Sequence, residues 1–136
     1  MASDELTAPA AATSDGAASS SQAEAAKRLS RALMRLYKEQ FGRGPEKALS
    51  YFVGPDTVIC RLYDSLTPVE RSMLAMGERQ RLRDIRMMFQ YATEDQFRAA
   101  VEEATGRKVR AFMSGVDVDQ DISCEVFTLE PLSDPS

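Results

Sequence analysis

Thirty consecutive residues, 41–70, contain a helix stop, a hairpin and a helix start, and they constrain the fold more than any other stretch. Gly42 is placed to end a preceding helix in a left-handed conformation, and Pro45 prevents that helix from resuming. Two strand-length apolar runs, residues 48–53 and 57–63, then flank a Gly-Pro-Asp turn. This pattern is typical of a β-hairpin between two helices.

The motif Leu-Thr-Pro-Val-Glu at residues 66–70 predicts where the next helix begins. Thr67 is a good N-cap, Pro68 suits the first helical position, and Glu70 completes a capping box three residues after the cap. After this short helix, an apolar stripe predicts a longer helix over residues 78–104. Residues 93–96 could start a new helix instead, but the stripe keeps its phase there, so we predict one continuous helix.

The remaining periodic segments complete an α+β fold. Residues 22–40 show one helical stripe of leucines between basic residues, and Thr105-Gly106 is a stop signal for the long helix. Residues 108–116 and 122–129 predict a second hairpin, whose last strand is apolar on both faces. We therefore predict the order α-β-β-α-α-β-β, with helices packed on a four-stranded antiparallel sheet. Two-sided burial of the last strand fits either a second subunit or helices on each side.

The ends of the chain differ in composition from its middle. Residues 1–22 are mainly Ala, Ser, Thr, Asp and Gly, and such a segment buries too little apolar surface to order itself. We predict a disordered tail over residues 1–22, a single domain over 23–130 and a frayed tail over 131–136.

Composition narrows the function. Histidine is absent, which removes the commonest general base and most zinc and iron sites. The two cysteines, Cys60 and Cys124, fall in strand-like runs and are interpreted as buried thiols. The aspartates of residues 117–121 lack the glycine and glutamate of a calcium loop. We therefore expect no enzyme, no metal and no cofactor.

The net charge of −4 is divided along the chain. Residues 27–110 hold all 17 Lys and Arg, against 11 Asp and Glu, while residues 1–26 and 111–136 hold only acids. A domain without a clear basic excess is not expected to bind nucleic acid. No apolar run is long enough for a membrane span and no signal peptide is visible, so we expect a cytoplasmic protein.

Arginines provide the candidate binding residues. Arg43 lies between Gly42 and Gly44, a loop that could offer backbone N–H groups and a guanidinium to an anion or serve as a tight turn. A row on one face of the predicted long helix is formed by Arg79, Arg83 and Arg86. Solvent and neighbouring acidic residues could compensate their positive charge, or the row could bind an anion or an acidic partner.

The order and spacing of several motifs resemble the MpsC-like family, over about residues 24–130. The motifs are Gly42-Arg43-Gly44-Pro45; Asp56 before a strand that ends in Arg61-Leu62; Leu66-Thr67-Pro68-Val69-Glu70; Arg86; Glu103-Ala104-Thr105-Gly106 with Val109; and Val126-Phe127-Thr128-Leu129. Residues 117–121 depart from the family's last hairpin because they lack a glycine turn.

The resemblance implies a link to a Na⁺-translocating, membrane-potential-generating system whose membrane partners resemble inorganic carbon transporters. It implies no chemistry, cofactor or catalytic residue. Two hypotheses follow. The chain is a non-catalytic accessory or regulatory domain that works through protein contact, with a homodimer expected, or it is a small-anion or nucleotide sensor that uses Arg43, Arg79, Arg83 and Arg86.

Overall fold

The computed structural model describes residues 20–132. The tail predicted for residues 1–22 lies outside this range except for its last three residues, which belong to the first described helix, α2 (Ser20–Phe41). Most of the tail predicted for residues 131–136 also lies outside it. The helix therefore begins two residues earlier than its periodicity predicted.

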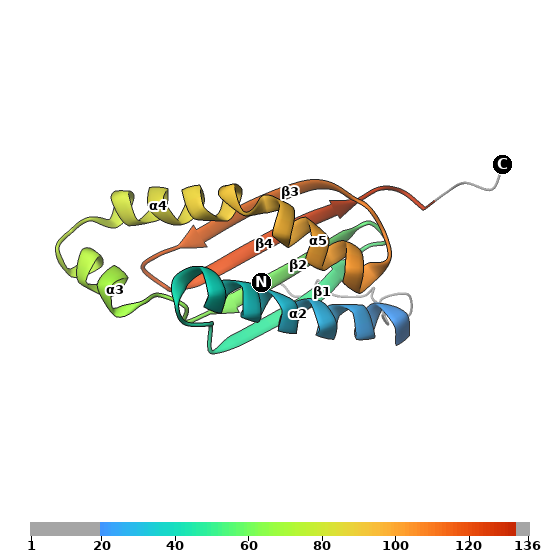
Figure 1. Cartoon of the computed structure of the whole chain (residues 1–136), viewed down its shortest axis with the longest axis horizontal. Helices are drawn as coiled ribbons and strands as arrows, with labels where there is room; N and C mark the ends of the chain where they lie inside the picture. The colour runs from blue at the N-terminus through green and yellow to red at the C-terminus, as the bar shows by residue number, and fades with distance from the viewer. Residues whose placement is uncertain (1–19, 133–136) are drawn as a thin grey trace, which may run out of the picture.

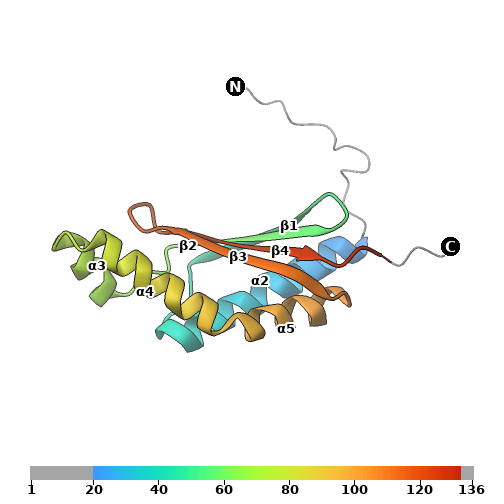
Figure 2. The same cartoon turned by 90° about the horizontal axis from the view of Figure 1, so that it is seen from above.

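A four-stranded antiparallel sheet forms one layer of the molecule and helices form the other (Figures 1 and 2). The predicted α+β class is confirmed. The strands are β1 (Lys47–Val53), β2 (Thr57–Tyr63), β3 (Val109–Asp117) and β4 (Ile122–Leu129), and their order in the sheet is β1-β2-β4-β3. Helices α2, α4 (Arg79–Ala92) and α5 (Glu94–Thr105) lie on one face of the sheet. Within residues 20–132 no helix lies over the opposite face, so the described helices do not cover both sides of the last strand.

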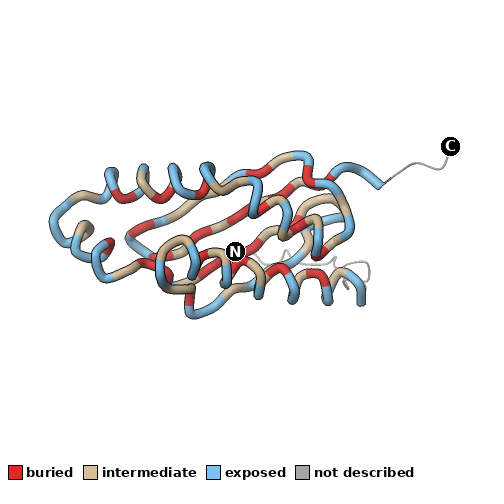
Figure 3. The backbone as a smooth tube through the Cα atoms, viewed as in Figure 1, coloured by how far each residue is buried: buried red, intermediate tan, exposed pale blue. Residues whose placement is uncertain are grey.

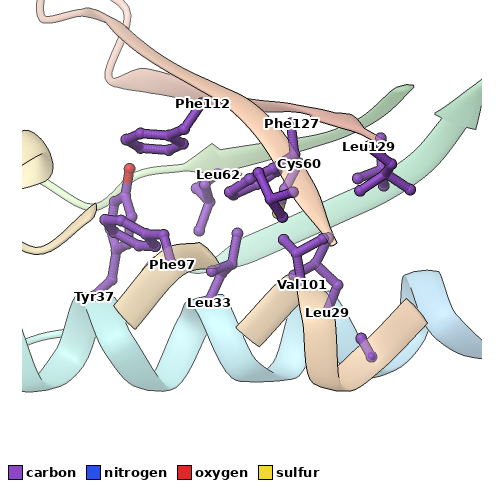
Figure 4. Close-up of a cluster of buried hydrophobic side chains, with 13 residues drawn as sticks. Leu29, Leu33, Tyr37, Cys60, Leu62, Phe97, Val101, Phe112, Phe127 and Leu129 are labelled. Carbon is purple, nitrogen blue, oxygen red and sulfur yellow. The ribbon is translucent and has the colours of Figure 1, made fainter. Parts of the chain in front are cut away.

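The core lies between the sheet and the helices, and alternation along the strands decides which side chains enter it. The inward residues Val58, Cys60 and Leu62 of β2 are fully buried, in keeping with the alternation of side chains along a strand. They pack with a stripe of α2 that includes Leu29 and Leu33. Figure 4 shows this cluster closing against aromatic side chains of α5, β3 and β4, and Figure 3 shows burial alternating along the strands.

Local signals set the ends of several helices. The predicted capping box is present at the start of α3 (Pro68–Ala75), because the Thr67 hydroxyl accepts from the Glu70 N–H and the Glu70 carboxylate accepts from the Thr67 N–H. Gly42 and Gly106 follow α2 and α5 with φ values of +87° and +72°, the left-handed conformation that glycine adopts without strain.

The continuous helix predicted over residues 78–104 is wrong, because the helix breaks at Thr93 into α4 and α5. The Thr93 hydroxyl donates to the carbonyl of Phe89, 2.9 Å away. The Gln40 amide, from the end of α2, donates both to that carbonyl and to the Thr93 hydroxyl. These side-chain bonds satisfy the end of α4 and let α5 follow α2 across the sheet (Figure 1).

The turn of the second hairpin, residues 118–121, is exposed to solvent at only two of its four residues. Asp121 is 5% exposed, and its carboxylate accepts from the N–H groups of Ser65 and Leu66. Val118 in the same turn is also buried, against Leu66 and Leu82. The turn therefore ties the sheet to the start of α3. Within residues 20–132, no helix has the length and apolarity that crossing a membrane requires.

Candidate functional site

The predicted binding arginines lie in different environments. Arg43 donates to the carbonyl of Leu66 at 2.5 Å, which holds the loop after α2 against the start of α3. Arg79 pairs with Asp119 at 2.7 Å across the exposed end of the second hairpin. Arg83 is exposed and makes no ion pair within the described part of the chain.

Arg86 is completely buried, so it does not share an exposed row with Arg79 and Arg83. Its guanidinium donates to both carboxylate oxygens of Glu70, at 2.7 and 2.6 Å, and to the carbonyl of Ser65 at 3.0 Å. It also lies 3.8 Å from the ring centroid of Phe41. The structure therefore brings Arg86 together with the capping-box glutamate rather than with the other candidate arginines.

The glycines around Arg43 have a structural explanation. Gly42 ends α2, as described above. A Cβ atom at Gly44 would lie 3.2 Å from the carbonyl oxygen of Met34, so the loop packs directly against the helix. This close approach, followed by Pro45, fits a tight helix-to-strand connection.

Glu70 has two neighbours that favour its charged form. Burial raises the pKa of the Glu70 carboxyl, but hydrogen bonds from Arg86 and from the Thr67 backbone outweigh burial and hold that pKa below its usual value. The carboxylate therefore joins the helix cap to the buried arginine. It is occupied by these contacts and is not free to act on a ligand.

A second buried polar group lies beside this ion pair, below β4. Glu125 is 0% exposed, and its Oε2 accepts from the Tyr37 hydroxyl at 2.6 Å and from the Gln90 amide at 2.8 Å. The same amide lies 2.6 Å from the Tyr37 oxygen. Glu125 Oε1 is buried and has no hydrogen-bond partner among the described residues. Figure 4 shows the Tyr37 hydroxyl reaching from α2 toward the sheet.

Glu125 is the most perturbed carboxyl group in this part of the chain. Burial raises its pKa to about 7, although the Tyr37 hydrogen bond and the charge of Arg86 act in the opposite direction. The group can therefore hold a proton near neutral pH. Because it is fully enclosed, a solvent-borne substrate cannot reach it in this conformation.

The sequence contained a signal for this group that we did not use. Glu125, Phe127 and Leu129 occupy every second position of β4, so all three point to the same face of the sheet. Phe127 and Leu129 are core residues, and this shared face predicts burial for Glu125 as well.

The uncovered face of the sheet carries a group of exposed apolar side chains. A row of four side chains crosses all four strands in register: Tyr51, Ile59, Val126 and Met113. Tyr51 and Met113, at the two ends of this row, are 38% and 55% exposed. Leu49 and Val53 extend the apolar surface along β1. Such a patch on a folded domain is typical of an interaction surface.

Basic side chains lie among the aromatic residues of this open face. The Arg61 guanidinium is 5.2 Å from the ring centroid of Tyr51 and 5.9 Å from that of Tyr63. The Lys47 ammonium lies 4.7 Å from the ring centroid of Tyr63. These cation–π contacts hold the Arg61 and Lys47 side chains against aromatic rings of the sheet.

Both cysteines are free thiols in separate surroundings. Cys60 is buried in the core, and burial raises the pKa of its thiol to about 12. Cys124 is only half-buried and lies on the open face, so the expectation of two buried thiols is correct for Cys60 alone. Among residues 20–132 no group of three or more acidic or cysteine side chains is arranged to hold a metal ion.

Comparison with known proteins identifies a family. A family model described as the Na⁺-translocating membrane potential-generating system (MpsC) matches residues 21–131 of the 136-residue chain. The match covers every described helix and strand apart from the first residue of α2. Neither a curated protein nor a solved structure matches the chain significantly.

Proposed function

The chain belongs to the MpsC family, and from that membership we propose that it serves a Na⁺-translocating membrane-potential system as a non-catalytic accessory domain. It acts through protein contact, as a homodimer in the cytoplasm. The single observation that carries the proposal is the open apolar face of the sheet. The free thiols of Cys60 and Cys124 are compatible with a reducing compartment.

A second copy of this chain is the occupant that fits the open face best. Four strands about 4.8 Å apart, with seven residues of about 3.3 Å each, give a face of roughly 19 by 23 Å. Two such faces cover on the order of 900 Å², and the relief of the side chains adds to this area. That size lies near the lower limit of specific interfaces, about 1,000 Å². We therefore expect a dimer that dissociates on dilution.

Charge placement favours one arrangement of the two copies. The outermost row of the open face begins with Lys47 on β1 and ends with Asp117 on β3. A twofold axis parallel to the strands stacks each row on the same row of the second copy, with β1 over β3. Lys47 then faces Asp117 of the other copy twice, and Tyr51 faces Met113, so charge and apolar surface are both matched.

The buried polar groups support a binding role over catalysis. The Glu70 carboxylate is engaged by Arg86 and by the capping box, and the Glu125 carboxyl is enclosed between the sheet and the helices. Catalytic acids and bases need contact with substrate. In this chain the Glu70 carboxylate instead holds α3 against α4 through Arg86, and the Glu125 carboxyl is shielded from solvent.

Sedimentation velocity of the full chain over roughly 1–300 µM tests the dimer. Wild type is expected to shift from monomer to dimer within that range, and Met113→Glu is expected to stay monomeric because it places a charge in the apolar row that the second copy would cover. Met88→Glu is the matched control, since Met88 is a similarly exposed methionine, at 61%, on α4. A strict monomer throughout, or a dimer that Met113→Glu leaves intact, would overturn the proposal.

A cellular experiment tests the accessory role. In cells that depend on the transport system, removal of this chain is expected to reduce the Na⁺-dependent membrane potential reported by a potential-sensitive dye. Wild type and Met88→Glu should restore the potential, whereas Met113→Glu should not. Equal restoration by all three proteins would show that the open face has no part in the function.

A further inference from the structure

A groove on the helical layer forms a second surface, on the opposite side of the molecule from the open sheet face. Helices α2 and α5 lie side by side there in both views (Figures 1 and 2). The groove encloses about 570 Å³ between the two helices. Its floor is made of small or aliphatic side chains: Ala32, Leu36, Ala99, Ala100 and Ala104.

Three arginines form one wall of this groove, and none of them is paired with a described carboxylate. Arg28, Arg31 and Arg35 are all exposed, and none of them makes an ion pair within the described residues. Arg28 donates a single long hydrogen bond to the carbonyl of Ala104, at 3.5 Å. Among the described residues that line the groove Glu103 alone is acidic, so three positive charges face one negative charge.

Most other arginines of the molecule differ in this respect. Arginines 43, 71, 79, 81, 86, 98 and 107 each lie within 4 Å of a carboxylate, at distances of 2.6 to 3.7 Å. Seven of the ten arginines outside this group are therefore paired with a carboxylate. The three on α2 stand out because they share one helix face beside an apolar floor.

We propose that this groove binds an acidic α-helix of a partner protein. Arg28 and Arg35 are seven residues apart, which is two helical turns or roughly 10 Å. A partner helix with carboxylates at matching intervals can pair with all three guanidinium groups. Small residues such as Ala32 and Ala99 let that helix approach closely, with its own small or apolar residues between the acids.

Other anionic partners fit the groove less well. A membrane surface is flat or convex toward the protein, whereas this basic surface is concave between two helices. Single-stranded nucleic acid is usually held by aromatic side chains on which bases stack. The described residues that line the groove include no aromatic side chain. The guanidinium groups on one wall and the small floor therefore favour a helix.

Fluorescence anisotropy with the full chain tests the proposal. The probe is a labelled, alanine-rich helical peptide with glutamates at positions i, i+4 and i+8, and the comparison peptide has lysines at the same positions. The acidic peptide is expected to bind saturably and to weaken as salt rises, while the lysine peptide does not bind. Arg31→Glu/Arg35→Glu should weaken binding by about tenfold or more.

Two further variants separate groove binding from general attraction to positive charge. Arg83→Glu/Arg110→Glu makes the same change in net charge at two exposed arginines outside the groove, and it should alter affinity less than about twofold. Ala99→Leu fills part of the floor without changing charge, and it should weaken binding severalfold. Circular dichroism and thermal unfolding check that each variant is folded.

The proposal is overturned if the acidic peptide does not bind, or if both charge-reversal pairs weaken it equally. Stronger binding to vesicles of phosphatidylglycerol and phosphatidylcholine than to the peptide, with no effect of Ala99→Leu, would assign the arginines to a lipid surface instead. The inference is independent of the proposed dimer, because Met113→Glu should bind the acidic peptide with wild-type affinity.

Discussion

Arg86 of α4 and Glu70 of α3 form a bidentate ion pair with N–O distances of 2.7 and 2.6 Å, and its arginine is completely buried. The same glutamate accepts from the Thr67 backbone N–H, so one carboxylate joins a helix cap to the interior. Breaking a buried pair by removing one partner leaves the other charge without compensation. The pair is therefore expected to hold α3 and α4 in place.

Replacement of Arg86 by methionine should lower the free energy of unfolding by about 3–5 kcal/mol. Arg86→Lys should recover little of this loss, because an ammonium group cannot make the forked contact with both oxygens of Glu70. Urea unfolding followed by circular dichroism measures the change. Arg83→Met is the control, since this exposed neighbour should alter stability by less than about 0.5 kcal/mol. A small effect of Arg86→Met would contradict a structural role for the pair.

Removal of the Thr67 hydroxyl should have a smaller effect. Thr67→Ala deletes the oxygen that accepts from the Glu70 N–H, and the loss of such a cap costs about 1 kcal/mol. Thr67→Ser keeps the oxygen and should remain within a few tenths of a kcal/mol of wild type. The comparison in urea is decisive, because equal losses in both variants would assign the effect to the methyl group rather than to the cap.

The sequence predicted those parts of the fold that depend on neighbouring residues. The capping box at Thr67 and the left-handed glycines at 42 and 106 are local features, and the structure contains each of them. The inward face of β2 was also predictable, because Val58, Cys60 and Leu62 alternate with half-exposed residues. In each case the residues within one element determine its conformation.

The break between α4 and α5 could not be predicted in this way. The apolar stripe keeps its phase across Thr93, and the groups that end α4 include Gln40, which is 53 residues away in the sequence. Arg86 was misplaced for a similar reason. Its spacing from Arg79 and Arg83 indicated an exposed row, whereas Glu70 and Phe41 provide the contacts that bury it.

The buried carboxyl of Glu125 should make stability depend on pH. Its pKa is about 7 in the folded chain against 4.5 as the ordinary value, so folding favours the protonated form. The folded state then holds one more proton than the unfolded state between these values, and stability falls as pH rises from about 4.5 through 7. The loss is on the order of 3 kcal/mol and is complete above that range.

Glu125→Gln should reduce this dependence. Glutamine keeps an oxygen that can accept from the Tyr37 hydroxyl but carries no titrating charge. Relative to wild type, the variant should gain stability at pH 8 compared with pH 5, measured by urea unfolding at both values. Glu103→Gln changes an exposed glutamate and should leave the pH dependence unaltered. If Glu125→Gln and wild type lose stability in parallel from pH 5 to 8, the carboxyl does not titrate in this range.

The arrangement of the proposed dimer can be tested by exchanging charges at the two ends of one row. With the twofold axis parallel to the strands, Lys47→Glu faces Asp117 of the second copy, and Asp117→Lys faces Lys47. Each single variant should weaken dimerisation by about fivefold, because like charges then meet at two symmetric positions. The double variant Lys47→Glu/Asp117→Lys restores opposite charges and should recover most of the affinity. Lys108→Glu, an exposed lysine outside the open face, is the control.

With the axis perpendicular to the strands, Lys47 would instead lie over Val53 of the second copy. The double variant would then be no tighter than the weaker single variant in sedimentation equilibrium.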